Sequence, residues 1–123
     1  MPVFTCVRDG VLVLTVDGDY TSNELRRVAF GAFEAEDTPN PVPVLLDMSG
    51  AAGLVPKSTE ELQASGAIFG AYRDRITGIG VLASADVQPL FAPDGYLGSK
   101  AGVNVQVCQS QADAHEWLTG PPR

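Results

Sequence analysis

The short apolar run Val44–Met48 constrains the fold of this chain more than any other segment. It is too short to be a helix, and the segments before and after it carry apolar residues at helical spacing. A short apolar run between two helices is typical of a strand that is covered on both faces, as the strands of parallel sheets are. The run therefore predicts a central strand in an α/β fold.

The first residues of the chain predict an antiparallel hairpin. Two runs rich in β-branched residues, Val3–Arg8 and Val11–Asp17, are separated only by Asp9-Gly10. This dipeptide tolerates the positive φ angles of a tight two-residue turn. The chain is therefore expected to begin with two antiparallel strands.

Capping boxes indicate where two helices begin. Thr21–Glu24 is the first such box, and apolar residues follow it at helical spacing up to about Glu36. Ser58 with Glu61 is the second, and it predicts a helix of about four turns that ends near Arg75. Both helices are expected to be amphipathic and to pack against the sheet.

The second half of the chain continues the alternation of strands and helices. The further elements expected are a strand Ile76–Ala83, a helical segment from Asp86 to about Ala101 broken by Pro89 and Pro93, a strand Asn104–Cys108, and a helix Ser110–Leu118. Strands that alternate with helices form a largely parallel sheet through crossover connections. We therefore predict one domain over residues 1–120, with a mostly parallel five-stranded sheet and an antiparallel strand from the hairpin, while 121–123 form a frayed tail.

The charge of the chain excludes several classes of partner. Fifteen acidic residues against eight basic ones give a net charge of −7. This field repels phosphate backbones and anionic lipid surfaces, so neither nucleic acid nor membrane is expected as a partner. The apolar runs are shorter than the roughly 20 residues that span a bilayer, and the N-terminus does not resemble a secretory signal. A cytoplasmic location is the expectation.

The residues that usually carry catalysis are scarce. His115 is the single histidine, and without a second histidine or a nearby cysteine it does not make a zinc site, so it is expected on a helix surface. Cys6 and Cys108 are expected to be free thiols, buried or half-buried. Gly78–Ala83 matches a dinucleotide-binding pattern, but its glycines begin a strand instead of following one. We therefore expect no cofactor and no metal, and an enzyme is only a third alternative.

The position of functional loops follows from the predicted sheet. In open parallel sheets, ligands bind outside the carboxyl ends of the strands. Here those ends lead into the expected loop Ser49–Lys57, the loop Ser84–Val87 and the region after Cys108. A binding site is therefore expected near these segments.

The element order and the segment Val44–Gly50, which reads VLLDMSG, resemble STAS domains and especially their SpoIIAA-like branch. The resemblance implies a non-catalytic, regulatory protein-interaction module whose partner is an anti-sigma-like protein or a second copy of the chain. In signalling members a D-S-S-G loop with a phosphorylated serine follows. Aligned without gaps, Lys57 takes the place of that serine, and Val55 and Pro56 take the places before it, so the switch motif is missing.

Two sets of candidate residues follow from this resemblance. The binding candidates are Asp47, Ser49, Gly50, Lys57, Ser58 and Thr59. Among them, Ser58 and Thr59 are candidate phosphate acceptors, because added negative charge is favourable at a helix N-terminus. Ser58 is explained equally by its role as the helix cap.

A second function class comes from the likeness of this branch to lipid-carrying CRAL-TRIO domains. It implies a small apolar, lipid-like ligand. The residues that would line an apolar cleft or a homodimer face are Gly66, Phe69, Gly70, Phe91 and Tyr96. Ordinary core packing of these residues is the alternative, with the glycines allowing close approach of the backbone.

Overall fold

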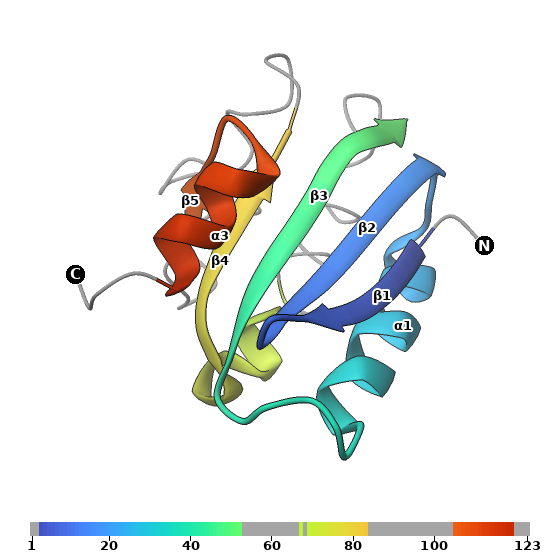
Figure 1. Ribbon diagram of the computed structural model, residues 1–123. Helices are drawn as coiled ribbons and strands as arrows, with labels where there is room; N and C mark the ends of the chain where they lie inside the picture. Colours follow the sequence, from blue (N-terminus) through green and yellow to red (C-terminus); the bar gives the residue numbers. More distant parts are fainter. Residues whose placement is uncertain (1–2, 53–66, 68, 84–104, 120–123) are drawn as a thin grey trace.

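The computed structural model describes residues 3–52, 67, 69–83 and 105–119. Its strands and helices, in chain order, are β1 (Val3–Arg8), β2 (Val11–Asp19), α1 (Ser22–Glu34), β3 (Val42–Ala52), the 3-10 helix η1 (Arg73–Arg75), β4 (Ile76–Leu82), β5 (Val105–Val107) and α3 (Gln111–Thr119). The strands form one sheet in the order β1-β2-β3-β4-β5 (Figure 1). Only β1 and β2 pair antiparallel, and every other pair is parallel. The predicted α/β fold class and sheet are confirmed.

The N-terminal hairpin has the tight turn that its sequence predicts. Asp9 and Gly10 have φ angles of 53° and 79°, so both central residues are in the left-handed region that a two-residue hairpin turn requires. Arg8 pairs with Val11 on either side of the turn. The ladder then continues without irregularity as far as the pair Val3 and Val16.

The first helix begins at its predicted capping box. The backbone N–H of Glu24 donates to Thr21 Oγ1 over 3.1 Å, and the Thr21 hydroxyl donates to the Glu24 carboxylate over 3.2 Å. The helix ends at Glu34, close to the predicted end at Glu36. Its residues Leu25, Ala29 and Phe33 are buried against the sheet. A side chain also caps the N-terminus of α3, where the N–H of Asp113 donates to Ser110 Oγ over 3.1 Å.

The sheet separates two cores of unequal size. On one face, α1 together with Phe69 and Tyr72 covers the larger core, whose strand residues include Leu12, Leu14, Val44 and Leu46. On the other face, α3 covers a smaller core that includes Val11, Val13, Leu45, Leu82 and Ala114. Figure 1 shows α3 in front of β4 and α1 behind β1 and β2. Because β3 contributes alternate residues to both cores and is the middle strand of the sheet, it is the central strand that Val44–Met48 predicts.

The third strand is longer than predicted. It runs over Val42–Ala52, whereas the sequence pattern predicts only Val44–Met48. The expected loop Ser49–Lys57 therefore does not begin at Ser49, and its first residues continue the strand. The reason is pairing with β2, which is also longer than predicted and places Asp17, Gly18 and Asp19 beside Gly50, Ala51 and Ala52. A long-range backbone partner thus holds residues whose local preference is for turns.

One prediction on the cysteines is wrong. Both are free thiols, as expected, but Cys6 is exposed and only Cys108 is partly buried. Cys6 faces the same side of the sheet as its partner Val13, and on this side α3 makes most of its contacts with β3 and β4. Burial raises the pKa of the Cys108 thiol, and the negative charge of Asp113 adds to this effect.

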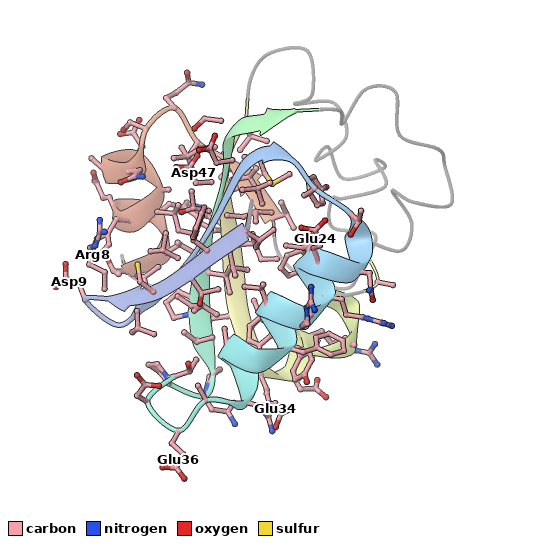
Figure 2. The ribbon with its side chains drawn as sticks, turned by 90° about the vertical axis from the view of Figure 1, so that its right-hand side faces the viewer. Arg8, Asp9, Glu24, Glu34, Glu36 and Asp47 are labelled. Carbon is pink, nitrogen blue, oxygen red and sulfur yellow. The ribbon has the colours of Figure 1, made fainter. Side chains whose placement is uncertain are left out.

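Aromatic and charged residues join the end of α1 to the segment before β4. The Tyr72 ring stacks on Phe33 and meets Phe30 edge to face, each with ring centroids 4.8 Å apart. The Tyr72 hydroxyl donates to Glu34 Oε1 over 2.8 Å, and Arg75 donates to the backbone carbonyl of Phe33 over 3.2 Å. Figure 2 shows Glu34 at the end of the sheet opposite Asp47. The helix predicted to end near Arg75 becomes a turn at Tyr72, followed by η1.

We predict that the contribution of Tyr72 to stability is lost at high pH. The hydrogen bond to Glu34 raises the pKa of the Tyr72 hydroxyl above its ordinary value of 10.0, with burial and the charge of Glu34 acting in the same direction and Arg75 opposing them. A raised pKa means that the stabilisation is complete below pH 10.0 and is lost as the pH rises through the folded-state pKa.

The test compares urea unfolding of the wild type with that of Tyr72→Phe, which keeps the ring contacts. The difference in unfolding free energy between the two proteins should be constant at neutral pH and should shrink above about pH 10. The other groups that titrate in this range are shared by both proteins and cancel. A difference that stays constant through pH 11 would contradict the prediction.

The close approach of α3 to the sheet depends on Gly80 in β4. A Cβ atom at this position would lie 3.2 Å from the Ala114 Cβ and 3.4 Å from Leu118 Cδ1. Ala114 is fully buried on α3, so it gives way only if the helix shifts. Gly80 therefore sets the distance between α3 and β4.

We predict opposite effects of one substitution at two glycines. Gly80→Ala should lower the free energy of unfolding by about 1–2 kcal/mol, because it overpacks the contact with α3. Gly31→Ala should raise it by about 0.5–1 kcal/mol, because Gly31 lies in α1 with no atom near its missing Cβ and alanine is the better helix former. Denaturant unfolding measures both changes. If Gly80→Ala is neutral or stabilising, the approach of α3 is not set by this residue.

Candidate functional site

The candidate site centres on Asp47, which lies in the middle of β3 and pairs with Leu82 at the end of β4. Its Oδ1 atom accepts hydrogen bonds from the backbone N–H of Ser49 over 3.0 Å and from the Ser49 hydroxyl over 2.5 Å. Its Oδ2 atom accepts from the Gln111 side-chain amide over 3.3 Å. Both oxygens of one carboxylate are thus engaged, and the middle of β3 is tied to the start of α3.

The local sequence explains this arrangement. Residues two positions apart in a regular strand point to the same face, so Asp47 shares with Leu45 the face that α3 covers in part. Aspartate side chains readily accept from the backbone N–H two residues later. Asp47 is only partly buried and Ser49 is exposed, so the pair forms a fixed polar surface on the strand.

A second carboxylate lies beside Gly50. Asp17 of β2 pairs with Gly50, and a Cβ atom at Gly50 would lie 2.9 Å from Asp17 Oδ1. Glycine therefore leaves the space that the Asp17 side chain occupies. Asp17 is exposed and Asp47 is partly buried, so the two residues place negative charge on adjacent strands. The pairing of Asp17 with Gly50 depends on an irregularity between Thr15 and Asp17, where the single residue Val16 lies opposite two residues of β3.

The structure brings together three of the predicted binding residues, namely Asp47, Ser49 and Gly50. The other three, Lys57, Ser58 and Thr59, lie outside the described residues, so the phosphate-acceptor hypothesis stays a prediction.

Of the five residues predicted for an apolar cleft or dimer face, the structure describes Phe69 and Gly70. Phe69 is only 6% exposed and packs in the larger core, so it does not form part of an exposed dimer face. Its neighbour Gly70 is partly buried. Gly66, Phe91 and Tyr96 lie outside the described residues, and the apolar-ligand hypothesis stays a prediction for them.

Sequence reasoning missed two members of the site. The sequence pattern predicts Asp17 only as the end of a strand, whereas the parallel pairing of β2 with β3 places it beside Gly50, three residues after Asp47. Gln111 carries no signal in the sequence, because its contact with Asp47 joins residues 64 positions apart. Such a contact depends on where α3 packs across the sheet.

The polar groups of the site do not form a nucleophile with its base. The Ser49 hydroxyl donates to Asp47, and the chain's single histidine lies elsewhere: His115 Nε2 is 4.0 Å from Asp9 Oδ2 at the hairpin turn. Within residues 3–52, 67, 69–83 and 105–119, no group of three histidine, cysteine or acidic side chains is arranged to hold a metal ion. No helix among the described residues is long and apolar enough to cross a membrane.

A solved structure has a similar fold. It is the crystal structure of an uncharacterized protein from the DUF3478 family with a SpoIIAA-like fold, from Shewanella loihica PV-4. The similarity has a TM-score of 0.64 and covers 94% of this chain and 91% of that chain, at 13% sequence identity. No protein-family model and no curated protein matches the sequence. The fold is therefore SpoIIAA-like and divergent in sequence, as the resemblance implied.

We predict that Asp47 protects the Ser49 amide from exchange with solvent. Asp47→Ala removes the acceptor of that N–H and should lower the free energy of unfolding by about 1 kcal/mol. Hydrogen exchange measured by NMR should show faster exchange at Ser49 in this variant. Gln111→Ala is the control, because it removes only the contact to Oδ2 and should leave the Ser49 amide protected. Equal exchange rates in the wild type and Asp47→Ala would contradict the assignment.

Proposed function

We propose that this chain is a non-catalytic protein-interaction module that binds its partner with the surface around Asp17 of β2 and Asp47 of β3. The observation that carries the proposal is the arrangement of Asp47, Ser49 and Gln111. Ser49 and Gln111 both donate hydrogen bonds to the Asp47 carboxylate, and together they form an ordered, partly exposed surface. A surface that is already ordered loses little conformational entropy on binding, which favours recognition of a partner.

The charge of this surface suggests the chemistry of the partner. Asp17 and Asp47 lie on the adjacent strands β2 and β3, and the whole chain carries a net charge of −7. A partner with lysine and arginine side chains on its binding surface complements this charge. Electrostatic attraction of this kind mainly increases the association rate and the specificity.

The experiment captures partners from native extract with three forms of the chain. The wild type is compared with Asp17→Lys, which reverses charge at the proposed surface, and with Glu36→Lys, which makes the same change at an exposed position. Figure 2 shows Glu36 at the end of the molecule opposite Asp47. We expect a basic protein that the wild type and Glu36→Lys retain and that Asp17→Lys loses.

The captured protein is then measured with purified components. Its association rate should fall as salt rises, because the salt screens the opposite charges. Equal retention by all three forms would place the contact elsewhere on the chain. Failure to capture any protein across several growth conditions would count against an interaction module.

A further inference from the structure

Among the described residues, β1 has a strand partner on one side only, so its outer edge is open to pairing. The two edge strands of the sheet differ, since β5 has only three residues and β1 has six. Natural edge strands are usually short, or carry charges, proline or a bulge that prevents another strand from pairing with them. Strand β1 has a regular ladder with β2, contains no proline and has its one charge, Arg8, at its end. Figure 1 shows it as the outermost strand on its side of the sheet.

The backbone groups that face outward follow from the hairpin turn. In a two-residue turn the residues on either side, here Arg8 and Val11, form a hydrogen-bonded pair. Hydrogen-bonded and non-hydrogen-bonded pairs alternate along an antiparallel ladder. The N–H and C=O groups of Phe4, Cys6 and Arg8 therefore face β2, and those of Val3, Thr5 and Val7 face away from it.

The side chains of this strand are exposed to an unusual degree for apolar residues. Phe4 is 53% exposed and Val7 is 39% exposed, and they are the exposed large hydrophobic residues of the described part of the chain. They lie on opposite faces of the same strand, because they are an odd number of residues apart. A strand added at this edge would cover both.

We propose that a second copy of this chain pairs with β1 through its own β1, antiparallel and centred on Cys6. A two-fold axis perpendicular to the sheet preserves its two faces, so even-numbered residues lie opposite even-numbered residues. In this register Thr5 and Val7 of each copy exchange their outward backbone hydrogen bonds with Val7 and Thr5 of the other. The two sheets then continue into each other.

A cation–π contact between the two copies favours this register and this direction. Antiparallel pairing centred on Cys6 places the Arg8 guanidinium of each copy beside the exposed Phe4 ring of the other, which is a favourable cation–π arrangement. Parallel pairing would instead bring the two arginines together. Antiparallel pairing centred on Thr5 would leave Arg8 of each copy without the Phe4 ring of the other copy opposite it. The edge therefore complements itself in one arrangement better than in the others.

The size of the contact predicts its strength. Pairing of two six-residue strands buries less than the roughly 1,000 Å² that a stable interface needs. The dimer is therefore weak and depends on protein concentration. This surface lies on a different strand edge from the proposed partner site at Asp17 and Asp47, so either proposal can fail without the other.

Cross-linking through Cys6 tests the register. Opposite residues of a non-hydrogen-bonded pair have Cα atoms about 4.5 Å apart, which is within the range of a disulfide. In full-length Cys108→Ser protein, diamide as the oxidant should join two Cys6 thiols into one disulfide, with two electrons and two protons passing to the diamide. The control carries Thr5→Cys with both native cysteines changed to serine. Residue 5 is exposed, as Cys6 is, but in the proposed register it lies opposite Val7 of the other copy. The covalent dimer should therefore form much more slowly in this variant.

Sedimentation velocity of the reduced protein tests the noncovalent dimer. The wild type should show a dimer fraction that grows with concentration. Thr5→Pro should abolish it, because proline removes an outward N–H, and edge strands tolerate proline at such positions. Arg8→Glu should also abolish it, while Arg27→Glu, the same charge change on an exposed part of α1, should not. A wild type that stays monomeric at every concentration, or equal cross-linking through Thr5→Cys and Cys6, would overturn the proposal.

Discussion

The structure depends on the parallel pairing of β3 with β2 on one side and β4 on the other. Alternate residues of β3 enter two different cores, with Val44 and Leu46 on one face and Leu45 on the other. This position requires a helical layer on each face, and it determines where the strand ends meet. The Asp47 site, the covering of Gly80 by α3 and the exposure of β1 all follow from the place of these three strands in the sheet.

The parts of the fold that local chemistry determines could be predicted from the sequence. Asp9-Gly10 requires positive φ angles, and Thr21 with Glu24 caps a helix, whatever the rest of the chain does. The extension of β3 through Ser49 and Gly50 could not be predicted in this way. These residues favour turns, and only their pairing with the end of β2 makes them a strand.

The candidate site also has one part that the local sequence predicts and another that depends on distant contacts. Asp47 and Ser49 stand two residues apart, so their contact is readable once a strand is assumed, whereas Gln111 reaches Asp47 only because α3 packs across β3 and β4. The exposure of Cys6 was mispredicted for a related reason. An apolar strand looks the same in sequence whether it lies in the middle of a sheet or at its edge, and strand order comes from contacts distant in the chain.

The irregularity between Thr15 and Asp17 has a consequence for how this chain tolerates changes in length. One residue of β2 lies opposite two residues of β3 at this point, and the extra residue is what brings Gly50 to the side of the sheet that Asp17 faces. Deleting a single residue between Asp47 and Gly50 would restore a regular ladder in which Gly50 still lies opposite Asp17. A deletion in the regular part of the ladder before Asp47 would instead turn the side chains beyond it to the opposite face. The number of residues in β3 is therefore less constrained at the irregularity than in the regular ladder before it.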